Sequence, residues 1–99
     1  MNSPKLPKLT VALAFTEQYN RRAARFLRQQ PDSRQHYLKT LQLLQANSPH
    51  PSLRLHALHG KFEGLHSVSI HLSYRITLEL IIQDQQIIPV NVGDHDAVY

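Results

Sequence analysis

The sequence predicts an α+β domain in which two helices precede a mainly antiparallel β-sheet. The first half contains two segments whose apolar residues recur at helical spacing, and the second half contains several runs in which apolar and polar residues alternate. No repeat, low-complexity tract or long linker divides the 99 residues. We therefore expect one domain over residues 1–99, with the element order β-α-α-β-β-β-β.

The first strand and the two helices occupy the first half. Residues 9–15 alternate between apolar and smaller side chains, as in a strand, and Thr16 suits the N-cap of the helix that follows. That helix ends before Pro31, and the next begins after Asp32 or Ser33 and stops at residues 47–49. Their apolar stripes are Tyr19, Ala23, Phe26 and Leu27, then Tyr37, Leu38, Leu41 and Leu44. We expect a helical hairpin packed on one face of the sheet.

Four strands are expected in the second half. Residues 53–58 predict a short strand, residues 60–64 a turn, and residues 65–72 a strand with Val68, Ile70 and Leu72 on one face. Residues 75–80 and 87–92 alternate on either side of the polar turn 83–86, which predicts a β-hairpin. Pro89 lacks a backbone donor, so its strand is expected at an edge or unpaired there. His66 and His71 are expected to be ordinary, half-exposed strand residues.

Charge is distributed unevenly. Residues 1–50 carry eight Lys/Arg and two Asp/Glu, whereas residues 51–99 carry three and five, together with five of the seven histidines. The basic half suits either a polyanionic partner or a solvated helix face. The lack of cysteine excludes disulfides and thiolate metal ligands. No apolar run is long enough for a membrane span or a signal peptide, so we expect a soluble, cytoplasmic protein that does not bind membranes.

Four segments that follow the predicted helices carry a resemblance to a known family. They are LHALHG at 55–60, GLHSV at 64–68, YRI at 74–76 and GDHDAVY at 93–99. In this order they resemble the RelE/ParE superfamily of type II toxins, and most of all its RelE/YafQ branch. The resemblance spans about residues 8–99. It implies a RelE-like fold, ribosome-dependent mRNA cleavage without metal or cofactor, and a cognate antitoxin that binds the toxin in a hetero-oligomer.

The resemblance also implies roles for particular residues. Arg75 matches the arginine that contacts the scissile phosphate, and His95 matches a histidine used for acid/base work near the C-terminus. Tyr99 matches a terminal aromatic implicated in catalysis or base stacking, and His56 a histidine before an L-x-G element. The sequence departs from the YafQ pattern at three positions. His59 replaces a lysine, and Ser69 and Ser73 replace a histidine and an aspartate, which leaves the general acid less well defined than the base.

Metal-free RNA scission needs a base for the 2′-hydroxyl, a cation for the phosphorane and an acid for the leaving 5′-oxygen. Imidazole titrates near neutrality and guanidinium binds phosphate with two parallel bonds, so His95 suits the base or the acid and Arg75 the phosphate, with His56 and Lys61 assisting. Three of the candidate residues also have a simpler, non-catalytic explanation. Arg75 could pair with Glu79, His95 could be an ordinary surface residue, and Tyr99 could belong to a frayed chain end. Without cysteine or nearby acids, His56 and His59 do not predict a metal site. Further candidate phosphate contacts are Lys61, His59, Arg21, Arg22 and Arg25, although the arginines, with Arg28, could equally be a solvated helix face.

With this chemistry, the resemblance implies a toxin that cuts translated mRNA in the ribosomal decoding site. A rival from another class is a ParE-like inhibitor that binds DNA gyrase without nuclease activity. A third is a decayed toxin or a basic RNA-binding module.

Overall fold

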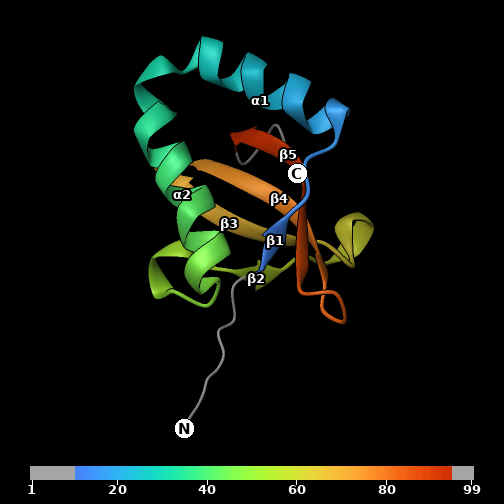
Figure 1. Ribbon diagram of the computed structural model, residues 1–99. Helices are drawn as coiled ribbons and strands as arrows, with labels where there is room; N and C mark the ends of the chain where they lie inside the picture. The colour runs from blue at the N-terminus through green and yellow to red at the C-terminus, as the bar shows by residue number, and fades with distance from the viewer. Residues whose placement is uncertain (1–10, 95–99) are drawn as a thin grey trace, which may run out of the picture.

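The computed structural model of the protein describes residues 11–94 (Figure 1), and it has the predicted α+β architecture. Five strands form one sheet in the order β1-β5-β4-β3-β2. β1 (Ala12–Leu13) runs parallel to β5 (Gln86–Asp94), and β4 (Tyr74–Ile81), β3 (His66–His71) and β2 (His56–Ala57) continue the sheet with antiparallel pairing. The first strand is predicted over residues 9–15. Within its described part, only β1 pairs with another strand.

Helix α1 (Glu17–Gln29) begins and ends where the sequence predicts. The hydroxyl of Thr16 accepts a hydrogen bond from the backbone N–H of Tyr19 at 3.1 Å, which satisfies one of the free donors at the helix start. Tyr19, Ala23 and Phe26 form its buried stripe. The helix stops before Pro31, where a single 3₁₀ turn, η1 (Pro31–Ser33), redirects the chain.

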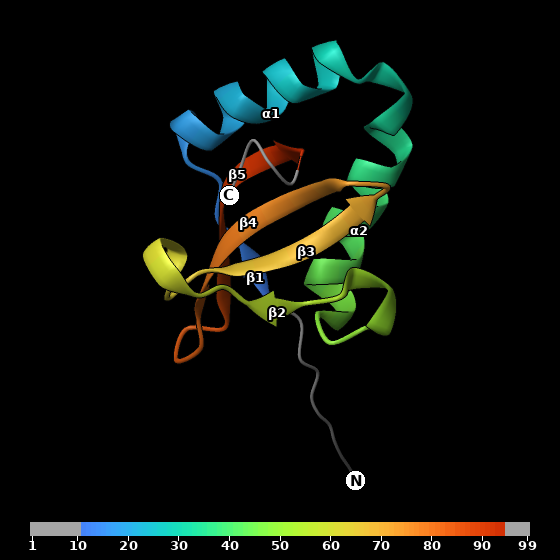
Figure 2. The same cartoon turned by 180° about the vertical axis from the view of Figure 1, so that it is seen from behind.

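Helix α2 (Arg34–Asn47) buries Tyr37, Thr40 and Leu44, whereas Leu38, which the apolar stripe included, is 44% exposed. The expected helical hairpin is wrong. Helix α1 packs on β5 and α2 packs on β3, and the two helices are steeply inclined to each other instead of lying side by side (Figures 1 and 2). They meet only through buried side chains, among them Tyr19 and Phe26 of α1 and Tyr37 of α2. The turn at η1 sends them in different directions, so each helix covers a different part of the same sheet.

The second half of the chain differs from its predicted strands in two places. Leu53 is buried in a 3₁₀ turn, η2 (Pro51–Leu53), so the predicted strand 53–58 shrinks to β2. Leu72 lies in the β3–β4 turn with φ 52°, and its side chain is 82% exposed. The register shifts between Ser69 and His71, which breaks the alternation that placed Leu72 in the core.

The prediction for Pro89 is confirmed. β1 pairs only with Gln86 and Ile87, so among the described residues β5 has no strand on its outer side beyond that point. A register shift in the β4–β5 pairing lies next to Pro89, as expected for a residue without a ladder donor. Neither helix within residues 11–94 has the length and apolar character needed to cross a membrane.

The core lies between the helices and one face of the sheet. Val68, Ile76 and Val92 are direct cross-strand partners, so their side chains share that face. They pack with the buried side chains of both helices, listed as Tyr19, Ala23, Phe26, Tyr37 and Leu44. The hydroxyls of Tyr19 and Tyr37 are 2.8 Å apart in this core. Burial raises the pKa of both phenols, so the pair stays neutral.

His71 joins α2 to the sheet and is not an ordinary strand histidine. Its ring stacks on that of His36, with centroids 4.0 Å apart and planes at 3°, and its Nε2 lies 2.8 Å from the Ser33 hydroxyl oxygen. The ring of Tyr74 is 5.8 Å away. Burial, and secondly the adjacent His36 ring, lower the pKa of His71 below its ordinary 6.5. The contact therefore favours the neutral imidazole.

The contact of His71 with His36 and Ser33 predicts that the folded protein becomes less stable as the pH falls. The unfolded chain takes up a proton at His71 at higher pH than the folded chain does, so folding is favoured above pH 6.5 and loses this contribution as the pH drops below it. The thermal midpoint measured by circular dichroism should fall between about pH 7.5 and pH 5.5, and His71→Gln should fall less steeply. Equal slopes for the two proteins would contradict the assignment to His71.

Candidate functional site

The face of the sheet that points away from the helices carries a group of polar side chains. In β2, β3, β4 and β5, His56, Ser67, Thr77 and Asn91 are successive direct partners across the sheet. A second row of direct partners lies two residues further along these strands, on the same face. It consists of Ser69, Arg75 and Gly93. We call these residues, apart from Gly93, the polar face: His56, Ser67, Ser69, Arg75, Thr77 and Asn91.

The centre of the polar face has unmet hydrogen-bonding capacity. Ser67 and Thr77 are 0% and 2% exposed, and neither hydroxyl oxygen has a hydrogen-bond partner among the described residues. The Nε of Arg75, on the same face, is also buried and without a partner there. Buried polar groups are normally paired, because an unpaired one costs about 1–3 kcal/mol. Three such groups on one face call for a partner that the described residues do not supply, such as water or a polar ligand.

Arg75 is half-buried in β4, flanked by Ser69 on one side and by Gly93 on the other. Glycine has no side chain, so Gly93 adds no side-chain atoms beside the arginine. The alternative in which Arg75 pairs with Glu79 is not seen, since the described residues contain no ion pair between them and Glu79 is exposed. The guanidinium is thus available to an anion on this face.

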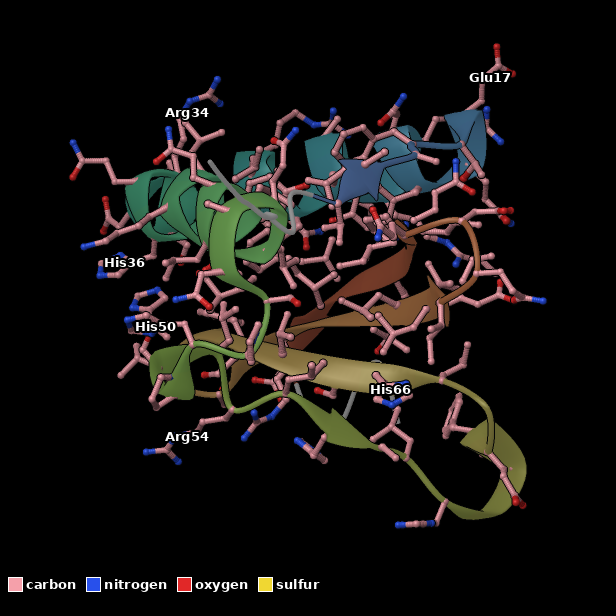
Figure 3. The ribbon with its side chains drawn as sticks, turned by 60° about the horizontal axis from the view of Figure 1, so that its bottom comes forward. Glu17, Arg34, His36, His50, Arg54 and His66 are labelled. Atoms are coloured by element: carbon pink, nitrogen blue, oxygen red, sulfur yellow. The ribbon has the colours of Figure 1, made fainter. Side chains whose placement is uncertain are left out.

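His56 is exposed at the end of the first row, and its orientation is fixed by its own strand. Its Nδ1–H donates to the backbone carbonyl of Arg54 at 2.8 Å. A carbonyl only accepts, so a neutral imidazole held this way carries its proton on Nδ1 and its lone pair on Nε2. Arg54 adopts φ 52°, and its side chain projects outward beside β2 (Figure 3). The geometry gives His56 a free basic nitrogen.

The structure does not bring all the predicted residues to the polar face. Arg21 and Arg25 are exposed on α1, and Arg22 donates from Nη1 to the carbonyl of Val90 at 2.9 Å. Helix α1 packs on the core side of the sheet, and Arg22 and Arg25 line a hollow that they share with Asn91 and Gly93 of β5. His59 and Lys61 are exposed in and next to the turn η3 (Gly60–Phe62), which connects β2 to β3.

His95 and Tyr99 lie outside the described residues. The described chain ends at Asp94, whose carboxylate accepts a hydrogen bond from the Ser73 hydroxyl at 2.9 Å. This bond ties the β3–β4 turn to the end of β5. Within residues 11–94, no group of three or more His, Cys, Asp or Glu side chains could hold a metal ion.

Sequence reasoning missed Ser67, Thr77 and Asn91. The alternation had already placed Ser67 and Thr77 opposite the core residues of their strands, yet each is an ordinary small polar residue by itself. Only the register shows that they are neighbours, and that they lie between His56 and Arg75. A buried hydroxyl in this position could not be recognised from one strand at a time.

Several solved structures with a similar fold are toxins or toxin-antitoxin complexes. YafQ from E. coli strain BL21(DE3) superposes with a TM-score of 0.66 over 90% of this chain and 98% of that chain, at 13% identity. The E. coli DinJ-YafQ toxin-antitoxin complex gives 0.64 at 17% identity, covering 91% and 98%. The RelBE2 toxin-antitoxin complex from Mycobacterium tuberculosis gives 0.59 at 15% identity, covering 86% and 98%.

The chain has a RelE/YafQ-like type II toxin fold. This confirms the fold that the four sequence segments imply, in which the two helices cover one face of the sheet. No protein-family model and no curated protein matches the sequence. At these identities the RelE/YafQ-like likeness establishes the fold alone.

Proposed function

We propose that the protein is the toxin of a type II toxin-antitoxin pair and that it cleaves mRNA on the ribosome. The observation that carries this proposal is the polar face, where Arg75 and His56 share one surface with hydroxyls whose hydrogen-bonding capacity is unmet. The RelE/YafQ-like fold supports it, because two of the structures with this fold are toxin-antitoxin complexes.

The proposed reaction uses side chains alone. A base removes the proton of the ribose 2′-hydroxyl, the 2′-oxygen attacks phosphorus, and the bond from phosphorus to the 5′-oxygen breaks as an acid protonates that oxygen. Arg75 offsets the charge on the phosphorane. In this scheme His56 acts as the base through its Nε2, since its Nδ1 is engaged with the Arg54 carbonyl. His95 serves as the second acid/base group, and Tyr99 stacks on a base of the substrate. Lys61 and His59 contact flanking phosphates.

Connectivity supports the place of His95 in this scheme. Gly93 is the direct partner of Arg75, and His95 follows it by two residues. Two residues of chain extend by at most about 7 Å. The described chain thus ends at Asp94, one residue after the direct partner of Arg75 and one residue before His95. Arg21, Arg22 and Arg25 are left out of the catalytic scheme because they lie on the helix side of the sheet.

The expected partners are a cognate antitoxin, the ribosome and its mRNA, and the cytoplasm is the compartment where these meet. A domain this small has room for only a shallow site, so the ribosome would supply much of the substrate positioning by holding the mRNA in an attack geometry. The toxin and its antitoxin would form a hetero-oligomer in which the toxin does not cleave mRNA.

A second candidate is a ParE-like inhibitor of DNA gyrase. The observation that favours it is the pair of serines, Ser69 and Ser73, at positions where the YafQ type offers a histidine and an aspartate. Ser69 is beside Arg75, and Ser73 is engaged with Asp94. Neither hydroxyl is an effective acid near neutrality, so the chemistry would fall entirely on His56 and His95.

Induction of the protein in cells, followed by mapping of RNA 5′-ends, separates the two functions. The nuclease predicts new 5′-ends within translated messages, which disappear when initiation is blocked. The gyrase inhibitor predicts intact messages, DNA breaks and blocked supercoiling of a plasmid by purified gyrase. Intact messages in cells whose growth is arrested would overturn the nuclease proposal.

A further inference from the structure

A small hollow lies between α2, η2 and β3. Its volume is about 180 Å³. Pockets that enclose a whole drug-sized ligand are larger, typically about 300–1,000 Å³. The hollow therefore has room for a small ion, or for one functional group of a larger molecule whose remainder stays outside.

Two side chains of α2 bring nitrogen donors to this hollow. His36 and Lys39 are three positions apart, so they lie on the same face of the helix, and both line the hollow. Both are exposed, and neither forms an ion pair with another described residue. The His36 ring is held flat against that of His71, yet no described residue hydrogen-bonds to its nitrogens. None of the described residues that line the hollow is acidic, so its positive charge is not neutralised from within.

A third donor comes from the backbone of β3, whose outer edge is open here. β2 pairs only with the first two residues of β3, and the chain before β2 turns away at Arg54, which adopts φ 52°. The carbonyl of Leu65 accepts from the N–H of Leu58, so Leu65 and every second residue after it direct their backbone groups to this edge. Ser69 is one of these residues, and it lines the hollow. Its N–H has no acceptor within residues 11–94, although backbone donors are normally paired.

The other polar side chains of the lining already have partners. The hydroxyl of Ser52 lies 2.8 Å from Nδ1 of His50, and the hydroxyl of Thr40 donates to the His36 carbonyl at 2.8 Å. The remaining capacity of the hollow is thus three donors, two of them on basic side chains. Figure 3 shows His36, His50 and Arg54 along the same side of the molecule, where they would attract an anion.

We propose that this hollow binds a phosphate group with at least three free oxygens, either inorganic phosphate or the terminal phosphate of a nucleotide. Lys39 and His36 donate to it from α2, and the N–H of Ser69 donates from the edge of β3. Charged side chains and backbone N–H groups are the usual donors to phosphate oxygens. A tetrahedral anion directs its oxygens to several sides and can meet donors from both elements. A carboxylate or an internal phosphodiester has only two oxygens to offer.

This inference goes beyond the proposed function and does not depend on it. Binding is measured on the purified protein, without ribosomes or mRNA. A failed cleavage experiment would leave the phosphate site intact, and a failed phosphate titration would leave the cleavage proposal intact.

The test is a titration of the isotope-labelled protein with inorganic phosphate at constant ionic strength, followed by amide chemical shifts. We expect the Ser69 amide to shift most, because its N–H gains an acceptor. Lys39→Gln should raise the dissociation constant by at least about tenfold, because a charged donor is lost. Arg34→Gln is the matched control, since it removes the same charge from an exposed position of α2 outside the hollow. It should raise the dissociation constant by less than about threefold.

A second ligand distinguishes the two sources of the phosphate group. If a 5′-mononucleotide shifts the same amides and binds at least about tenfold more tightly than inorganic phosphate, the natural ligand is a nucleotide with a terminal phosphate. Equal or weaker binding of the mononucleotide assigns the hollow to free phosphate.

Three results would overturn the phosphate site. The Ser69 amide could stay in place during the titration, acetate could shift it as much as phosphate does, or Lys39→Gln and Arg34→Gln could lose equal affinity. An RNA oligonucleotide without terminal phosphates that shifts the Ser69 amide as phosphate does would also contradict the proposal, and would assign the hollow to the RNA backbone.

Discussion

Arg75→Ala is expected to reduce ribosome-dependent cleavage by about 10²–10³-fold, as is found when one preorganised donor to a developing oxyanion is removed. Arg75 is held in β4 between Ser69 and Gly93 and has no ion-pair partner among the described residues, so its charge is free to act on a phosphate. The measurement is the single-turnover rate on a programmed ribosome. The fold should survive, because truncation also removes a buried Nε–H that has no partner there.

Two companion variants make this result specific. Arg75→Lys keeps the positive charge but not the planar pair of donors, so it should recover part of the lost rate and not all of it. Arg34→Ala removes an exposed arginine at the start of α2, on the helix side of the molecule (Figure 3). It should cleave at close to the unchanged rate. If Arg34→Ala loses as much activity as Arg75→Ala, or if Arg75→Ala keeps most of its activity, the phosphate role of Arg75 is wrong.

Alternation alone predicts most of the sheet. The strands that became β4 and β5 are confirmed in position, because their alternating apolar residues mark them. The period of two breaks at the bulge between Thr77 and Leu78, so the buried apolar residues of β5 are Ile87, Pro89 and Val92. The start of α1 is confirmed because Thr16 provides a side-chain cap and Pro31 ends the helix. These signals are local, and each can be recognised within a few residues of sequence.

The errors lie where a bend or a bulge breaks the local pattern. Leu53 and Leu72 are apolar residues in phase with their neighbours, yet one is buried in a 3₁₀ turn and the other is exposed at φ 52°. The direction of α2 relative to α1 depends on the single turn at η1, and nothing in the spacing of either helix specifies it. Such features depend on how the ends of elements meet in space.

The residues of the candidate site also fall into those that the sequence could predict and those that it could not. Arg75 and His56 were predicted from short motifs, and the structure places them on one face of the sheet. Ser67, Thr77 and Asn91 join them only through strand register, which relates residues ten or more positions apart. The role of the arginines on α1 could not be predicted, because it depends on which side of the sheet that helix covers. Sequence motifs thus identified the charged groups but not their surroundings.

His56→Gln is expected to slow cleavage by about 10²–10⁴-fold, the usual contribution of a general base or acid. The bond from Nδ1–H to the Arg54 carbonyl leaves Nε2 as the basic atom, and glutamine can keep a hydrogen bond to that carbonyl without offering a base. The loss should appear in the cleavage rate at saturating ribosome concentration and not in the concentration needed for half-saturation. His50→Gln, which changes a half-exposed histidine at the start of η2, is the matched control. The same measurement on His95→Gln decides which histidine is the base. If His56→Gln cleaves within about threefold of the unchanged rate and His95→Gln loses much of its activity, the base is His95 and not His56.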